Sequence, residues 1–211
     1  RGVGREIAQT LVVNGHEVVA LLRSDRTQES LTAMGVTTVI GDALEADTMC
    51  QLIGDSKADA VISTIGGLPE ESGVRPDFVG NKNLIDAAVS AQAKRFVLIS
   101  SIGSGNSASA LPQNVLETLG PLLKEKAQAE AHLANSGLDY TVIRPGGLVS
   151  ESATGQEVLT ADPTVAGSIP RAGVAQLAVQ CLSSHKAVNQ ILSAIDLSMQ
   201  RTDKAVEKFE L

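Results

Sequence analysis

The chain opens with Arg1-Gly2-Val3-Gly4-Arg5-Glu6-Ile7-Ala8, in which two glycines one residue apart lead directly into an apolar helical pattern. Glycines let a backbone approach a ligand closely, and a helix N-terminus offers free amide donors and partial positive charge to an anion. An apolar stripe begins at Ile7, and Asn14-Gly15 is a typical helix end. The stretch therefore predicts a phosphate-binding turn followed by a helix over residues 4–14, although two glycines alone are weak evidence because Gly-x-Gly often occurs by chance.

The rest of the chain alternates short β-branched runs with helical windows, the pattern of a parallel sheet wrapped by helices. The predicted strands are residues 17–22, 37–40, 60–64, 95–100, 140–144 and 190–194. The other predicted helices are residues 46–53, 77–91, 115–136, 173–183 and a charged peripheral helix over 203–209. Because helices follow the strands, right-handed crossovers give an α/β fold with helices on both faces, a Rossmann-type doubly wound parallel sheet.

A unit of this kind has its central strand just before the glycine turn. About ten residues of strand, with the first glycine of the turn, are therefore expected ahead of Arg1, so that the N-terminal strand is missing from the chain. No linker, charge block or repeat divides the chain, which predicts a single domain over residues 1–211. Residues 147–211 are expected to form small segments on the substrate side, and the loops 103–113 and 147–171 are candidate lids.

Composition excludes several kinds of partner. The net charge of −7 argues against nucleic acid or an anionic membrane, so that a bound phosphate has to be held by local donors. No apolar run reaches the roughly 18 to 20 residues of a membrane span, and no secretory signal is present. Cys50 and Cys181 fit no metal pattern and are expected on packed helix faces in a reducing cytoplasm. We expect a cytoplasmic monomer or homodimer that binds small molecules, without a metal.

The residue that ends the first predicted strand bears on the dinucleotide. Arg23 lies about 20 residues after the turn, where an acidic residue would bind the ribose 2′-hydroxyl of NAD and an arginine suits the 2′-phosphate of NADP. A charge-assisted bond of about 1.5–3 kcal/mol corresponds to a tenfold to hundredfold preference for NADP. The alternative is a solvated arginine at a strand end. Two further runs, Gly41-Asp42 and Thr64 to Gly67, follow later strands. Either run can border the ligand at the carboxyl edge of the sheet, or it can be only a turn.

Several further runs carry a resemblance to a known family. They are Leu21-Leu22-Arg23, Gly41-Asp42, Val61-Ile62-Ser63-Thr64-Ile65-Gly66, Asn83-Leu84-Ile85-Asp86-Ala87-Ala88, Phe96-Val97-Leu98-Ile99-Ser100-Ser101, Lys126-Ala127-Gln128-Ala129-Glu130 and, most specific, Ser136-Gly137-Leu138-Asp139-Tyr140-Thr141-Val142-Ile143-Arg144-Pro145-Gly146. With the glycine turn they cover nearly the whole chain. The chain resembles the atypical, NmrA-like branch of the short-chain dehydrogenase/reductase superfamily, close to its small NADPH-dependent reductases of the biliverdin-IXβ reductase/flavin reductase type.

The resemblance implies a set of sites for NADP(H). The implied cofactor-binding residues are Arg1, Gly2, Val3, Gly4, Arg23, Asp42, Ala43, Thr64, Ile65, Gly66, Ser100, Pro145 and Gly146. In this set the two arginines flank the 2′-phosphate, the glycine turn lines the pyrophosphate, Asp42 touches the adenine, and Pro145-Gly146 borders the nicotinamide. Ser101 matches the active-site serine or threonine of the family, and Lys126 matches the lysine of its Tyr-x-x-x-Lys pair, which makes these two the implied catalytic residues.

The catalytic pattern departs from the family at one position. Leu122 stands four residues before Lys126, where the family has a tyrosine, and Tyr140 is predicted in a buried strand. The tyrosine donates a proton to a carbonyl, an effect typically worth about 10²–10⁴-fold. A conjugated acceptor delocalises the incoming electrons and takes its proton from solvent. We therefore expect an NADPH-dependent oxidoreductase that acts on a flavin, biliverdin or quinone.

Other interpretations of the same residues stay open. Ser101 can be a strand-end cap, and Lys126 can belong to a solvated helix face with its charged neighbours. Loss of the tyrosine also fits an NADP-sensing regulator or assembly factor without turnover, the second function. A third, an epimerase or dehydratase, is disfavoured most by the missing tyrosine.

Overall fold

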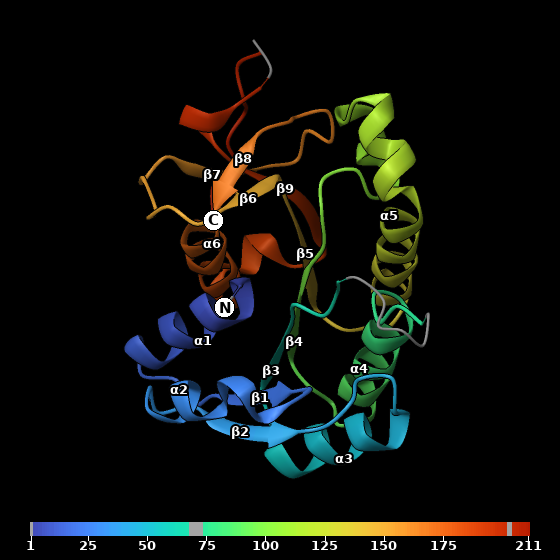
Figure 1. The fold of residues 1–211 in the computed structure, drawn as a ribbon, viewed down its shortest axis with the longest axis vertical. Coiled ribbons are helices and arrows are strands. Elements are labelled where there is room, and N and C mark those ends of the chain that lie inside the picture. Colours follow the sequence, from blue (N-terminus) through green and yellow to red (C-terminus); the bar gives the residue numbers. More distant parts are fainter. Residues whose placement is uncertain (1, 68–73, 202–203) are drawn as a thin grey trace.

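The computed structural model describes residues 2–67, 74–201 and 204–211 (Figure 1). Its helices are α1 (Val3–Val13), α2 (Gln28–Thr32), α3 (Ala46–Ser56), α4 (Val79–Ser90), α5 (Gln113–Ala134) and α6 (Arg171–Ser183), with short 3₁₀ helices η1 (Asp25–Thr27), η2 (Gly105–Ala110), η3 (His185–Ala187) and η4 (Leu197–Met199). Its strands are β1 (Val19–Leu22), β2 (Thr37–Ile40), β3 (Ala60–Ser63), β4 (Arg95–Ile99), β5 (Tyr140–Pro145), β6 (Gly147–Val149), β7 (Glu157–Thr160), β8 (Ser168–Pro170) and β9 (Gln190–Asp196).

The strands confirm the Rossmann-type α/β fold. Strands β3, β4, β5 and β9 pair in parallel in the order β3-β4-β5-β9-β7, and only the last strand, β7, runs antiparallel to its neighbour. β1 and β2 form a separate parallel pair. β6, which follows β5 directly in the chain, pairs with β8 in another two-stranded parallel sheet. The carboxyl ends of the parallel strands therefore lie at one edge, where open α/β sheets bind ligands.

Strand β4 separates two hydrophobic cores, since its side chains alternate between the faces of the sheet. Val97 and Ile99 pack in the core that α1 and α6 share, while Phe96 and Leu98 pack in the core that includes side chains of α3, α4 and α5. Figure 1 shows α1 and α6 on one side of β4 and β5, with α4 and α5 on the other. This arrangement gives three layers, with helices on both faces.

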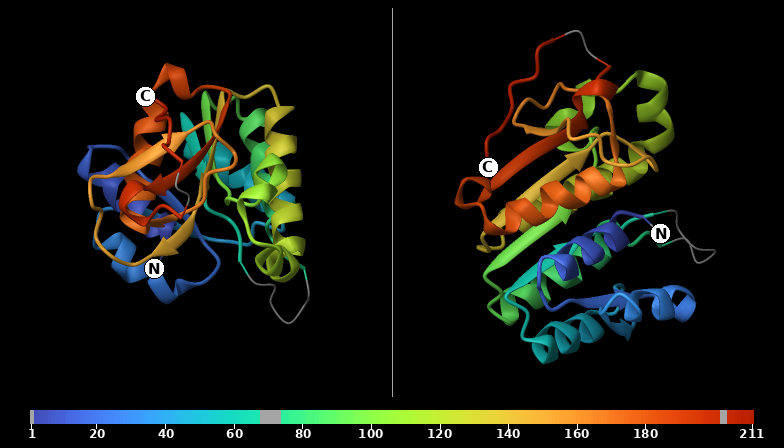
Figure 2. Two further views of the ribbon diagram at one scale, coloured as in Figure 1. Left: turned by 90° about the horizontal axis from the view of Figure 1, so that it is seen from above. Right: turned by 90° about the vertical axis from the view of Figure 1, so that its left-hand side faces the viewer.

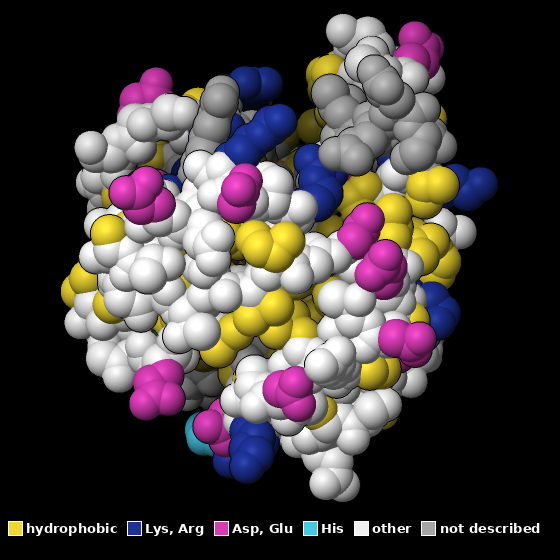
Figure 3. All heavy atoms as spheres, turned by 60° about the horizontal axis from the view of Figure 1, so that its bottom comes forward, with side chains coloured by type: hydrophobic (Ala, Val, Ile, Leu, Met, Phe, Trp, Pro, Cys, Tyr) yellow, Lys and Arg dark blue, Asp and Glu magenta, His cyan; other side chains and the backbone are white. Residues whose placement is uncertain are grey.

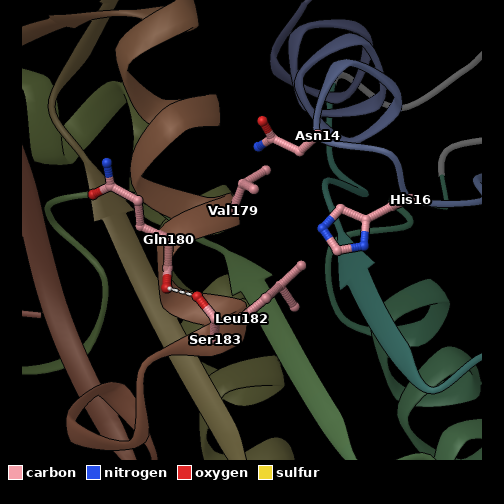
Figure 4. Close-up of a pocket in the computed structure, with 6 residues that line it drawn as sticks. All are labelled: Asn14, His16, Val179, Gln180, Leu182 and Ser183. Carbon is pink, nitrogen blue, oxygen red and sulfur yellow. Dashed lines mark hydrogen bonds between the residues drawn. The ribbon is translucent and has the colours of Figure 1, made fainter.

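Helices α1 and α6 run in the same direction. They pack along one another, and residues from the C-terminal ends of both line one small pocket of about 310 Å³ (Figure 4). Asn14 and His16 enter it from the end of α1, and Leu182 and Ser183 from the end of α6. The N-terminal ends of the two helices therefore also lie together, which places Arg171 near the glycine turn. Figure 2 shows the same parallel course.

A larger hollow, of about 760 Å³, lies between β1 and β3. Side chains of α1 and β1 line one part of it, and β3 with its following loop lines another. In a doubly wound sheet this is the place of the central strand, which was expected ahead of Arg1. That expectation concerns residues outside the sequence and stays a prediction.

Two expectations were wrong. Residues 204–211 are not helical, and residues 202–203 lie outside the described part. Instead, the Phe209 amide donates to the Leu159 carbonyl at 2.7 Å. Phe209 and Leu211 both pack on the core of α1 and α6, because residues two apart in an extended segment point to the same side. Cys50 is exposed on α3, whereas Cys181 is buried as expected.

Candidate functional site

The glycine turn forms the start of α1. Gly2 is the residue before the helix and has a φ of 100°, a conformation that L side chains rarely adopt. A Cβ on Gly4 would lie 2.7 Å from Thr64 Oγ1, so that the first turn of α1 packs directly against the loop after β3. Among the described residues no side chain caps the helix, which leaves its first amides available to an anion.

The ligand edge of the hollow between β1 and β3 lies beside this turn, beyond the expected place of the central strand, and has a positive lining. Arg5, Lys126 and Arg171 contribute to it, and the described residues that line it include no aspartate or glutamate. Arg171 Nη1 donates to Ser150 Oγ at 3.0 Å, and within the described chain neither Arg5 nor Arg171 forms an ion pair. Figure 3 shows several Lys and Arg side chains gathered in the upper part of the face that it displays. The lining thus provides the local donors that a phosphate requires in a chain of net charge −7.

The two candidate catalytic residues line the same hollow. The Ser101 hydroxyl donates to the carbonyl of Ile102 at 2.9 Å. Lys126 Nζ lies 2.9 Å from Asp77 Oδ1, and its side chain is only 13% exposed, so that it is not part of a solvated helix face. Leu122, one turn earlier on α5, also lines the hollow, so that an alkyl group occupies the position of the family's phenol. Tyr140 is the first residue of β5, at the end of the strand opposite the ligand edge.

The structure brings together part of the predicted set. The residues of that set that line the hollow are Gly2, Val3, Gly4, Thr64, Ile65, Gly66, Ser100, Ser101 and Lys126. The others that are described, Arg23, Asp42, Ala43, Pro145 and Gly146, do not line it, and Arg1 lies outside the described residues.

The residues outside the hollow have other surroundings. Arg23 is exposed just beyond β1. Asp42 Oδ1 accepts the Leu44 amide at 2.9 Å, an Asx turn. A Cβ on Gly146 would lie 2.3 Å from the Gly167 carbonyl oxygen, so that glycine is required there for a close approach of two backbone segments.

A buried ionic network lies behind Ser100, which lines the hollow. Arg144 donates to Glu130 through Nε at 3.1 Å and through Nη2 at 2.6 Å, and both side chains are at most 5% exposed. The hydroxyls of Ser100 and Ser104 also donate to Glu130 Oε1. Ser100 is thus held by α5, whereas its neighbour Ser101 meets this network through its backbone carbonyl, which accepts the Ser104 hydroxyl at 2.8 Å.

Sequence reasoning missed four residues of the site: Arg5, Asp77, Glu130 and Arg171. Arg5 follows the second glycine of the turn directly, and that position was the available signal. Asp77, Glu130 and Arg171 lie far from the turn in sequence. Arg171 lines the hollow, and Asp77 and Glu130 contact Lys126 and Ser100, which line it. The features together suit an anionic dinucleotide: glycines that permit close approach, an uncapped helix N-terminus and, among the described residues, a lining with cations and no carboxylate.

Comparison with known proteins agrees with this geometry. A family model described as "NAD(P)H-binding" matches residues 1–185. The chain belongs to this NAD(P)H-binding family.

Its relatives include named reductases. Sanguinarine reductase from Eschscholzia californica is 35% identical over 155 residues, which cover 66% of this chain and 55% of that protein. A solved structure of ChuY, described as an anaerobilin reductase from Escherichia coli O157:H7, has a TM-score of 0.85 and 28% identity and covers 96% of this chain and 95% of its own. The protein named "uncharacterized sugar epimerase YhfK" from Bacillus subtilis is 31% identical over 205 residues, 93% of this chain and 91% of its own.

The family is reductase-like but also has members of other kinds. Photosystem II assembly factor Ycf39 from Cyanidium caldarium is 25% identical over 149 residues, which cover 71% of this chain and 45% of that protein. Some relatives are described as chloroplastic, so the cytoplasmic location stays a prediction. Within the described residues, no helix combines the length and the hydrophobicity of a membrane span.

Proposed function

We propose that this protein is an NADPH-dependent reductase of a flat conjugated acceptor of the flavin, biliverdin or quinone type. One observation carries the proposal: Ser101 and Lys126 line the same hollow as the glycine turn, while Leu122 occupies the place of the phenol. In this proposal the site retains the serine and the lysine that the resemblance implies, and it lacks the tyrosine that would protonate a carbonyl. Relatives named as reductases of sanguinarine and anaerobilin support a reductase that acts on a small molecule.

The protein holds the dinucleotide through three groups of donors. The amides at the start of α1 and the guanidinium groups of Arg5 and Arg171 bind the pyrophosphate. Arg23, at the end of β1, binds the 2′-phosphate and gives the preference for NADPH over NADH. The loop Thr64–Gly66 borders the ribose of the nicotinamide.

NADPH, when bound, supplies a hydride to the acceptor. Lys126 donates hydrogen bonds to the nicotinamide ribose and fixes the ring against the hollow. The side chains of Leu122 and Leu148, which also line the hollow, offer an apolar surface to a flat acceptor and exclude water from part of it. The Ser101 hydroxyl binds a polar atom of the acceptor, and the final proton comes from solvent.

A second candidate function is an NADP-sensing regulator or assembly factor without turnover. Leu122 in place of the phenol favours it, and a relative is named as an assembly factor. An epimerase, as one relative is named, is less well supported because the same leucine removes the usual acid–base group.

The test is consumption of NADPH, followed by its absorbance, with a panel of flavins, quinones, linear tetrapyrroles and sanguinarine. We expect one class of acceptor to accelerate consumption and Lys126→Met to lower kcat/KM by about tenfold to a hundredfold. Lys124→Met is the matched control, since Lys124 is exposed on the same helix. Tight NADPH binding without acceptor-dependent consumption would overturn the reductase in favour of the regulator.

A further inference from the structure

Lys126 has a fully buried partner. Asp77 precedes α4, and the exposed fraction of its side chain is 0%. Its Oδ1 forms an ion pair with Lys126 Nζ at 2.9 Å, and the described residues supply no hydrogen bond to this oxygen. The other oxygen, Oδ2, accepts the Gly67 amide at 3.2 Å. One carboxylate thus joins the lysine on α5 to the loop that follows β3.

The start of α4 fixes this loop by further bonds. Asn81 Nδ2 donates to the carbonyls of Asp77 at 2.7 Å and Ile65 at 3.3 Å. Asn81 Oδ1 accepts the Ser63 hydroxyl at 2.5 Å, and the same hydroxyl accepts the Ile65 amide at 3.3 Å. The Asn81 side chain therefore fixes the position of Asp77 relative to the loop after β3.

The ion pair also shapes the backbone above it. A Cβ on Gly66 would lie 2.6 Å from Asp77 Oδ1 and 2.8 Å from Lys126 Nζ. Only a glycine lets the loop rest directly on the pair. The carboxylate, the ammonium and the Gly66 backbone form one packed unit at the side of the hollow that holds Ser101 and Thr64.

A buried carboxylate without a partner is costly, and a lysine stem with four rotatable bonds is not fixed by packing alone. The ion pair holds the Lys126 ammonium, which carries three N–H donors, from one side. We propose that Asp77 is the positioning residue of Lys126: it aims the N–H donors of the ammonium at the ribose hydroxyls of NADPH, in a site that lacks the phenol beside which the family's lysine usually stands. This inference rests on the proposed function, because the ribose belongs to the proposed cofactor.

The experiment compares two ligands by titration calorimetry: NADPH and adenosine 2′,5′-bisphosphate, which lacks the nicotinamide ribose. We expect Asp77→Asn to weaken NADPH by about tenfold and to leave adenosine 2′,5′-bisphosphate within twofold of the original protein. Asp86→Asn is the matched control, since Asp86 pairs with Lys82 on the same helix but is 46% exposed. Equal weakening of both ligands would show a merely structural role and overturn the proposal.

A double-mutant cycle tests whether Asp77 acts through the lysine. We expect Asp77→Asn combined with Lys126→Met to bind NADPH no more weakly than Lys126→Met alone. Asp77→Glu, which retains the charge, is expected to recover part of the lost affinity. Additive losses in the cycle would contradict the proposal, because they would mean that the two residues act independently.

A third measurement separates this proposal from the function on which it rests. Reductive methylation, followed by mass spectrometry of peptides, reports how freely each amine reacts, with Lys124 as the internal reference. We expect Asp77→Asn to raise the labelling rate of Lys126 severalfold and to leave that of Lys124 unchanged. If NADPH does not bind the original protein, the proposed function fails, and an unchanged Lys126 rate would then also overturn the positioning role.

Discussion

Gly4 and Thr64 meet where the first turn of α1 touches the loop after β3. A Cβ on Gly4 would lie 2.7 Å from the threonine hydroxyl, so Gly4→Ala forces one of these segments to move. We expect a loss of about 1–3 kcal/mol in the free energy of unfolding and weaker NADPH binding. Urea denaturation and calorimetry measure the two effects.

A second substitution checks the cause. Thr64→Ala in the Gly4→Ala background removes the hydroxyl and is expected to restore most of the stability. Gly54→Ala is the control, because nothing lies within 4 Å of a Cβ at that helical position, and it is expected to raise the free energy of unfolding by about 0.5–1 kcal/mol. If Gly4→Ala raised the free energy of unfolding as much as Gly54→Ala, the close approach of Gly4 to Thr64 would not constrain the turn.

Arg23 is expected to govern the choice of dinucleotide in the proposed site. Arg23→Ala is expected to weaken NADPH by about tenfold to a hundredfold and NADH by less than twofold, since only NADPH carries the 2′-phosphate. Arg26→Ala, another exposed arginine in the following 3₁₀ helix, is the control. Parallel weakening of both dinucleotides would show that Arg23 does not contact the 2′-phosphate.

At the scale of elements, the pair Arg144–Glu130 links α5 to β5. Glu130→Ala leaves the Arg144 guanidinium buried without its carboxylate, and we expect a loss of about 3–5 kcal/mol in the free energy of unfolding by urea. Asp59→Asn is the comparison, since it breaks the exposed pair with Lys94 and is expected to leave stability unchanged. A loss in Glu130→Ala as small as that in Asp59→Asn would contradict a supporting role for the network.

Sequence patterns predicted the elements that are buried most. Strand β4 is apolar from Phe96 to Ile99 because both of its faces are covered, and the prediction for residues 95–100 ends one residue from the observed Arg95–Ile99. The final segment was misjudged because its charged residues resemble an exposed helix, while Phe209 and Leu211 pack as an extended chain. The glycine turn and Lys126 could be predicted from local motifs, but Asp77 could not. Its carboxylate gains a role only when α4 and α5 pack side by side.

At the scale of the whole molecule, two aspartates link stability to pH. Burial raises the pKa of Asp196, but hydrogen bonds from Ser198 and Thr154 outweigh it and hold the pKa below the ordinary value of 3.8. Asp86 behaves in the same way: burial raises its pKa, and Lys82 and His132 lower it below that value. A depressed pKa contributes stability above the unfolded value and loses it as the pH falls through the folded value.

We therefore expect the free energy of unfolding to fall as the solution is acidified from about pH 5 to pH 3. Asp196→Asn is expected to reduce the steepness of this fall, and Asp47→Asn, at an exposed position of α3, to leave it unchanged. Urea titrations at several pH values measure the slope. An unaltered slope in Asp196→Asn would show that this carboxylate does not contribute to acid unfolding.

The contact between the first turn of α1 and the loop after β3 has a consequence for how the molecule opens. Helix ends and loops open locally with lower free energies than a strand that is buried on both faces, such as β4. A ligand that binds only the closed form suppresses such openings by mass action. We expect deuterium to enter the amides of this turn and this loop well before those of β4 and β5. A dinucleotide that touches both segments would fasten them together, so NADPH should slow their exchange selectively and leave that of β4 and β5 unchanged.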